Sequence, residues 1–247
     1  MPSFCSTQRA KMSVWQKLNT KGTEAKALAR CGHSALLHNN QMVVFGGEDS
    51  ADRLLADVQV LDLDKLTWTR MDCKGASAGS STPGAGTPCA RSGHSAVVYK
   101  GAMFIFGGSG AGGKVLADLY SLDLSNGTWT LLAPSGKAPA ARSKHVAIVA
   151  GSSMIVHGGW NPDSGAAFKE LAIYSFESNE WKAVSVSGAV ERIWHSAVWR
   201  GKSSGSDELD GLYVVAGQLQ ELKLFDYFRV AGEDEQIFLH NELFHVT

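Results

Sequence analysis

Short apolar runs that stop at a pair of glycines recur along the chain. MVVF at 42–45, MFIF at 103–106 and MIVH at 154–157 each end in Gly-Gly, and each follows a segment such as HSAVVY at 94–99, in which apolar positions recur. Runs of this length between turn formers are typical of short, buried β-strands. No stretch has helical spacing with a cap at both ends, although the segment 218–228 is ambiguous and could form one or two turns of helix. The pattern therefore predicts an almost wholly β fold.

The strands belong to a repeat with fixed internal spacing. In each of three units a histidine precedes the first glycine of the Gly-Gly pair by 13 residues, and an acidic residue precedes a tryptophan by 11 residues. Three identical spacings point to one structural unit used repeatedly. Unit by unit, these residues are His33, Gly46, Asp57 and Trp68; His94, Gly107, Asp118 and Trp129; and His145, Gly158, Glu170 and Trp181.

Each unit contains four short strands. In the second unit they are HSAVVY, AMFIFGG, DLYSLDL and TWTLLA, and turn formers separate them. Such strands pair as an antiparallel meander, and a single sheet of this kind cannot bury both of its faces. Sheets stacked around a common axis cover one another's faces, the glycine pair lets a neighbouring sheet approach, and the tryptophan fills the widening gap near the rim. The repeat therefore predicts a propeller of stacked sheets.

A fourth motif completes the pattern, because the frame Arg-x-x-His opens each unit. It reads RCGH at 30–33, RSGH at 91–94, RSKH at 142–145 and RIWH at 192–195. Together with the Gly-Gly pair, the acidic residue and the tryptophan, this frame resembles the kelch repeat, a propeller blade of about 50 residues. The resemblance covers residues 14–217 densely and implies a kelch-type β-propeller of the galactose-oxidase-like superfamily, with four recognisable four-stranded antiparallel blades.

The predicted domain is a single propeller, and two ways of completing it stay open. We expect an N-terminal tail at 1–12, an outer strand at 13–20 and blades near 29–73, 90–134, 141–186 and 191–247. In the fourth blade Glu242 would take the place of Asp118, and the outer strand at 13–20 would supply the tryptophan strand that this blade lacks. The propeller is then either closed in four or part of a larger ring, and an open ring would expose sheet edges that favour self-association.

The composition and charge of the chain limit the classes of partner that we expect. The 23 basic and 24 acidic residues nearly cancel and form no runs, so we expect neither nucleic acid nor a membrane as a partner. The four cysteines show no CxxC pair, the first thirty residues lack the apolar core of a signal peptide, and the longest apolar runs are far too short to span a bilayer. These features predict a cytoplasmic protein with reduced thiols.

The repetition of the Arg-x-x-His frame suggests a structural role for these residues, since a functional site rarely needs four rotated copies. We expect these side chains to satisfy backbone carbonyls between neighbouring blades and to surround one mouth of the central channel. The alternative is that the ring of histidines or arginines binds a metal ion or an anion on the axis. The residues are Arg30, Arg91, Arg142 and Arg192, with His33, His94, His145 and His195.

Recognition is expected where the repeat varies, on the face that carries the loops between the second and third strands. Trp160 directly follows a Gly-Gly pair, and Trp194 replaces the glycine found at Gly93, so both are predicted as aromatic anchors or, alternatively, as blade packing. Arginines at the channel mouth would pair acidic groups of the partner. Phe225 and Tyr227, in the insert at 218–240, either form a contact patch or cap an open blade edge.

The resemblance implies a protein-interaction scaffold or adaptor, because kelch propellers mostly bind other proteins or peptides. The chain shows no GxSxG elbow, HExxH motif or phosphate loop, so we predict no catalytic residues, no metal and no cofactor. A propeller enzyme, or a binder of a small ligand or metal through the His/Arg ring, is the alternative.

Overall fold

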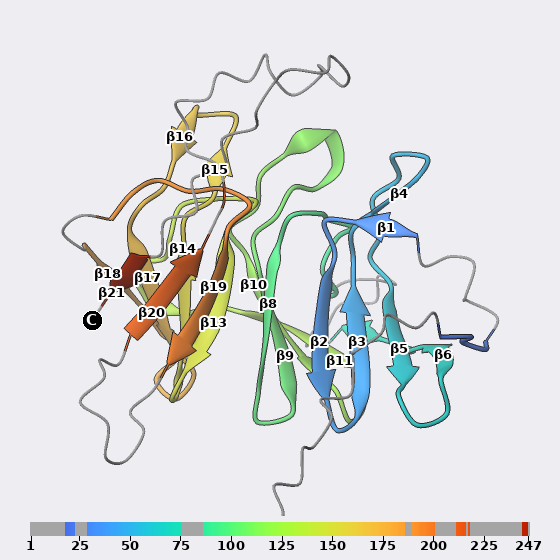
Figure 1. Ribbon diagram of the computed structural model, residues 1–247. Coiled ribbons are helices and arrows are strands. Elements are labelled where there is room, and N and C mark those ends of the chain that lie inside the picture. Colours follow the sequence, from blue (N-terminus) through green and yellow to red (C-terminus); the bar gives the residue numbers. More distant parts are fainter. Residues whose placement is uncertain are drawn as a thin grey trace, which may run out of the picture.

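The computed structural model describes residues 18–22, 29–75, 86–185, 189–200, 211–215, 217 and 244–246. This part of the chain is all-β, as the sequence predicts, and its only helical element is the single 3₁₀ turn η1 (Ala111–Gly113). The strands form separate small sheets that stand side by side (Figure 1). Within the described residues, no helix has the length and apolar character needed to cross a bilayer.

Blades one to three share a single plan. Each is an antiparallel meander in which the first strand pairs with the second, the second with the third and the third with the fourth. The tight turns between them fall at the glycine, asparagine and aspartate positions that the sequence marks as turns. The strands are β2 (Ser34–His38), β3 (Gln41–Phe45), β5 (Val58–Asp62) and β6 (Thr67–Arg70) in blade one; β8 (Ser95–Tyr99), β9 (Ala102–Phe106), β10 (Leu119–Asp123) and β11 (Thr128–Leu132) in blade two; and β13 (Val146–Ala150), β14 (Ser153–His157), β17 (Leu171–Ser175) and β18 (Glu180–Val184) in blade three.

A short parallel strand joins blade two to blade one, and another joins blade three to blade two. After leaving blade one the chain forms β7 (Lys74–Gly75) beside β11, and after leaving blade two it forms β12 (Ser135–Gly136) beside β18. Lys21 makes the same parallel contact with Thr67, at the start of β6. The predicted outer strand at 13–20 comes just before Lys21 in the chain, but residues 13–17 lie outside the described residues and 18–20 form no strand.

Blade four is described by three strands, β19 (Ser196–Arg200), β20 (Gly211–Val215) and β21 (Phe244–Val246). Phe244 pairs with Val214 as Tyr120 pairs with Ile105 in blade two, which is the register expected if Glu242 takes the place of Asp118. Glu242 itself, the tail at 1–12 and the insert at 218–240 with Phe225 and Tyr227 lie outside the described residues.

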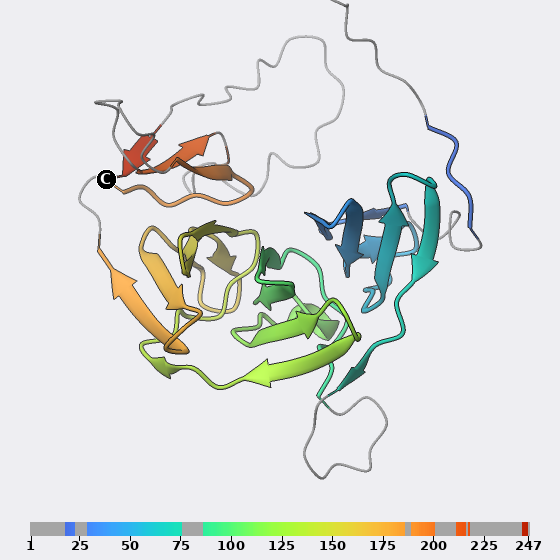
Figure 2. The ribbon, with the colours of Figure 1, turned by 90° about the horizontal axis from the view of Figure 1, so that it is seen from below.

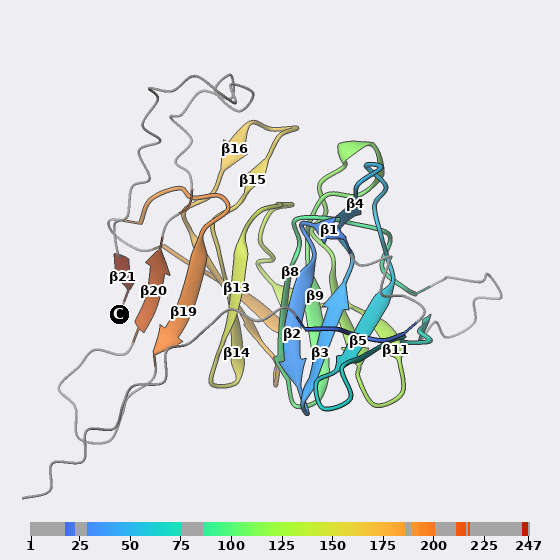
Figure 3. The same cartoon turned by 45° about the vertical axis from the view of Figure 1, so that its right-hand side comes forward.

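The four blades follow one another around a common axis. Figure 2 shows the sheets arranged radially from blade one (blue) through green and yellow to blade four (orange), with the first strand of each blade innermost. The inner strands contact one another in chain order, β2 with β8, β8 with β13 and β13 with β19. Blades one and four are the two ends of this arc and stand apart (Figures 2 and 3), so the described residues do not close the arc into a ring.

The core consists of the layers between neighbouring blades. Phe45 of blade one packs against Trp129 of blade two at 5.1 Å between ring centroids, and Phe106 of blade two packs against Trp181 of blade three at 5.3 Å. Both tryptophans are buried on the outer strands, where they fill the gap between diverging sheets as predicted. Truncation of such a side chain to alanine costs about 3–5 kcal/mol.

The connections that vary between blades gather on one face of the arc, uppermost in Figure 1. They include η1, the small antiparallel sheet of β1 (Arg30–Cys31) and β4 (Glu48–Asp49), and the hairpin of β15 (Trp160–Asn161) and β16 (Ala166–Ala167). We call this side the loop face. It carries the loops between second and third strands together with the segments that enter each blade, as the up-and-down course of the chain requires.

Candidate functional site

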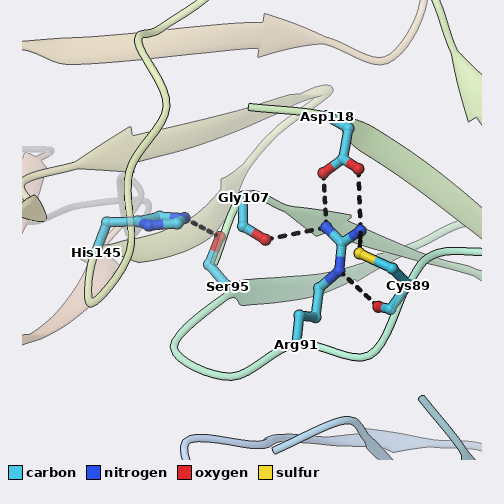
Figure 4. Close-up of polar contacts among 6 residues, drawn as sticks. All are labelled: Cys89, Arg91, Ser95, Gly107, Asp118 and His145. Carbon is cyan, nitrogen blue, oxygen red and sulfur yellow. Dashed lines mark hydrogen bonds and ion pairs between the residues drawn. The ribbon is translucent and has the colours of Figure 1, made fainter. Parts of the chain in front are cut away.

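The arginine of each Arg-x-x-His frame is held inside its own blade. In blade two, Nη1 of Arg91 donates to the carbonyl of Gly107 at 3.0 Å, and the two terminal nitrogens reach the Asp118 carboxylate at 2.6 and 2.9 Å (Figure 4). Its Nε donates to the carbonyl of Cys89 at 3.1 Å. The guanidinium therefore ties the entering segment, the Gly-Gly pair and the start of the third strand together through charge-assisted bonds.

The same contact recurs in the neighbouring blades. Arg30 bonds the carbonyl of Gly46 and both carboxylate oxygens of Asp57, at 2.8 and 3.1 Å. Arg142 bonds the carbonyl of Gly158 and one oxygen of Glu170. In blades one to three, the acidic residue that opens the third strand is thus the arginine's partner.

These contacts change the expected role of the arginines. Their carbonyl acceptors lie within one blade rather than between blades, and the guanidiniums do not line the channel mouth. Arg91, Arg142 and Arg192 are fully buried, and the Arg30 side chain is nearly so. This burial argues against the prediction that the four arginines pair acidic groups of a partner, because an incoming carboxylate has no exposed guanidinium to reach.

The histidines, in contrast, connect neighbouring blades. Nε2 of His94 lies 3.0 Å from the Ser34 hydroxyl of blade one, and Nε2 of His145 lies 2.8 Å from the Ser95 hydroxyl of blade two (Figure 4). The histidine ring also packs against the preceding Gly-Gly pair, so that a Cβ on Gly107 would come within 3.1 Å of His145 and 2.6 Å of the Arg142 carbonyl. Gly107 has φ +62°, so both space and backbone conformation require glycine there.

Blade three replaces this contact with a different pair. Where blades one and two have a serine paired in register with a phenylalanine, blade three has Val146 paired with His157. His195 of blade four therefore finds no serine, and its Nε2 instead lies 3.1 Å from Nδ1 of His157. The two substitutions compensate each other, because the histidine that replaces phenylalanine supplies the polar partner that valine cannot.

Burial keeps these imidazoles neutral. It is the main cause that lowers the pKa of His94 to about 3, and the positive charge of Arg91 lowers it further. Burial likewise lowers the pKa of His195 to about 3 and of His157 to about 4, and it holds the pKa of His145 well below its ordinary value. At neutral pH each ring thus offers one donor and one acceptor and carries no charge.

The histidines surround a cavity of about 130 Å³ at the loop-face end of the axis, which we call the mouth cavity. Its walls are the third and fourth residues of all four Arg-x-x-His frames, which confirms the predicted position of the histidines at the channel mouth. No group of three or more His, Cys, Asp or Glu side chains in the described part of the chain is placed to hold a metal ion. The lining residues are Gly32, His33, Gly93, His94, Lys144, His145, Trp194 and His195.

One cation at this mouth, Lys144, was not among the residues predicted from the sequence. The Lys144 ammonium lies 5.3 Å from the ring centroid of Trp160 and 5.1 Å from that of Trp194, within the range of cation–π attraction. Both predicted aromatic anchors thus contact one lysine. Trp194 is 49% exposed, and Trp160 is partly buried. The available signal was that RSKH and RIWH carry Lys and Trp where RCGH and RSGH carry glycine.

Radial four-stranded blades, bound to one another by histidines and braced internally by arginines, define a β-propeller of repeated blades. The chain belongs to the Kelch-repeat family, since residues 6–204 match the family described as "KLHDC2/KLHL20/DRC7 Kelch-repeats domain". Kelch-repeat domains generally bind proteins and are generally non-catalytic.

Comparison with curated proteins gives relatives of several kinds. The chain is 32% identical over 178 residues to Acyl-CoA-binding domain-containing protein 4 of Arabidopsis thaliana, covering 72% of this chain and 25% of that protein. It is 25% identical over 226 residues to human Kelch domain-containing protein 10, covering 88% and 47%. Human Host cell factor 2 is 33% identical over 174 residues, covering 63% and 20%. The chain spans less than half the length of these relatives.

Proposed function

We propose that this chain is a non-catalytic interaction module of the cytoplasm that binds an acidic segment of a protein partner on its loop face. The observation that carries the proposal is the cluster of Trp160, Lys144 and Trp194 at the mouth cavity. Large aromatic side chains beside a cavity supply contact area at a small cost in side-chain entropy, and they are enriched where interfaces draw most of their energy.

Variation among the blades supports this placement. Glu48, Ser109 and Trp160 occupy the same position after the Gly-Gly pair in blades one to three, so packing does not require an aromatic side chain there. The side chain of Trp194 contributes little to any core, because about half of its surface is open to solvent. Both tryptophans are therefore free to serve contact with a partner.

The proposal is tested by comparing partner recovery between the wild-type chain and a Trp160→Ala/Trp194→Gly double variant. Proteins cross-linked to the wild type in a cell extract should be lost from the variant, while the thermal unfolding midpoint stays within a few degrees. Recovery of the same proteins in the same amounts would overturn the proposal. Arg142→Ala is unsuitable for this purpose, because removal of a buried, paired guanidinium costs about 3–5 kcal/mol and tests folding instead.

A further inference from the structure

The cationic side chains of the described residues differ in whether a carboxylate already pairs with them. Arg30, Arg91 and Arg142 are buried with their own carboxylates, and the exposed pairs Arg53–Asp49 and Lys65–Asp62 neutralise one another. Lys144 is different, because it is half-buried and has no carboxylate partner in the described part of the chain.

The geometry points to Lys144 as the residue that accepts a carboxylate of the partner, with its ammonium held between Trp160 and Trp194. This inference rests on the proposed function and names the chemistry of the same site. A half-desolvated ammonium has three N–H donors, and an incoming carboxylate can form charge-assisted hydrogen bonds with it that are stronger than in open solvent.

The cluster is held in place by main-chain hydrogen bonds. The amide of Trp160 donates to the Ser143 carbonyl at 2.9 Å, the amide of Ser143 donates back to Trp160 at 3.0 Å, and the amide of Trp194 donates to the Lys144 carbonyl at 3.0 Å. The two aromatic walls are thus fixed relative to the lysine by backbone contacts from blades three and four. Such preorganisation reduces the entropy lost when a ligand binds.

Backbone strain gives a second, independent indication. Gly32 and Gly93 have φ near +62° and +65°, a region that glycine adopts freely. Lys144 and Trp194 occupy the equivalent positions with φ +61° and +56°. A non-glycine residue in this conformation is disfavoured, and such strain tends to persist at functional sites. The fold would accept glycine in all four blades, so the lysine and tryptophan call for a reason beyond the fold.

The surroundings favour an anion over a cation. Burial lowers the pKa of Lys144, and no carboxylate among the described residues opposes that shift. The imidazoles of His145 and His195 line the same cavity and are neutral, so they add no negative charge beside the ammonium. An acidic side chain on an extended peptide can therefore approach Lys144 without meeting a like charge among the cavity residues.

The test is a calorimetric titration of the full chain with a blocked peptide of alternating glycine and glutamate, compared with its glutamine counterpart. We expect the glutamate peptide to bind and the glutamine peptide to bind about tenfold more weakly or not at all. Lys144→Met should weaken binding of the glutamate peptide about tenfold, and Lys144→Arg should retain most of it. Trp194→Gly should weaken it roughly threefold while leaving the fold at least as stable, because glycine relieves the strained φ.

Lys100→Met is the matched control, because Lys100 also has a positive φ and a cation–π contact, with Tyr99 at 5.1 Å, but lies in a strand turn away from the mouth cavity. Unchanged binding by Lys144→Met, equal binding of the two peptides, or no binding of the glutamate peptide by the wild type would each overturn the inference. If partner recovery still depends on Trp160 and Trp194 in that case, the proposed interaction surface stands, but the acidic nature of the partner segment and the role of Lys144 do not.

Discussion

Restoration of the blade-three contact to the form found in its neighbours gives the sharpest test of how the blades are joined. His157→Phe and Val146→Ser, made singly and together, recreate the serine–phenylalanine pair that blades one and two contain. His157→Phe alone removes the only hydrogen bond that the described residues provide for Nε2 of His195, and burial keeps water from replacing it. Val146→Ser alone adds a hydroxyl next to His157 and His195, whose mutual hydrogen bond is already formed.

The magnitudes follow from the two neighbouring interfaces. A buried polar group left without its partner costs about 1–3 kcal/mol, so His157→Phe should destabilise the chain by that amount. In the double variant, the introduced serine hydroxyl should reach His195 as Ser34 reaches His94 at 3.0 Å, and the introduced phenylalanine should pack on His195 as Phe106 packs on His145 at 5.4 Å. The double variant should therefore regain most of the lost stability, which gives a coupling energy of about 1–3 kcal/mol.

Urea unfolding at pH 7, followed by tryptophan fluorescence, measures the wild type and the three variants on the same scale. The m-value should stay constant, because the surface exposed on unfolding hardly changes. If the two single effects simply add, with a coupling energy below about 0.5 kcal/mol, then valine and histidine do not compensate each other and the account of this interface is wrong.

Three further predictions concern stability and association. The pKa of His94 is about 3 in the folded chain and near 6.5 in the unfolded chain, so the stability that neutral His94 contributes is fully present above pH 6.5 and falls as the pH drops toward 3. For this residue alone the free energy of unfolding should fall by about 2 kcal/mol between pH 7 and 5, and urea titrations that show no loss over this range would contradict its burial. Gly107→Ala should destabilise the chain by more than about 2 kcal/mol because its Cβ would meet a carbonyl at 2.6 Å, whereas Gly101→Ala has open space around it and should cost only the strain of its positive φ. Equal losses of stability in thermal melts would show that the close approach at Gly107 does not matter. Leu37 is 69% exposed at the end of the arc, so sedimentation velocity should show self-association that Leu37→Glu reduces and that Leu131→Glu, on an outer strand, does not.

Local physical demands made most of the fold predictable from sequence. Gly107 must be glycine for both space and φ, and Trp129 must fill the gap beside Phe45, so the same residue types recur at these positions in units one to three. The pairing of Arg91 with Asp118 was also present as a constant separation of 27 residues in blades one and two, and 28 in blade three, but only the structure identifies it as a contact.

Contacts between blades could not be predicted from the spacing of residues alone. His94 meets Ser34 across 60 residues and His195 meets His157 across 38, and nothing in the local pattern states which serine or histidine lies opposite. The candidate site was predicted in part for the same reason. The tryptophans stood out as departures from the repeat, whereas the role of Lys144 depends on two rings contributed by different blades.

The structure also explains why the third residue of the Arg-x-x-His frame can differ between blades. At the third residue of each Arg-x-x-His frame the blades are joined by main-chain atoms alone, because the amide of Gly93 donates to Gly32, that of Lys144 to Gly93 and that of Trp194 to Lys144. These bonds form whatever the side chain is, provided that the residue accepts a positive φ. The arginine, histidine and glycine positions have no such freedom, since their side chains or the lack of one make the contact. A new side chain at the third position can therefore enter the mouth cavity without breaking the joint between blades, which is why we expect recognition to have evolved there.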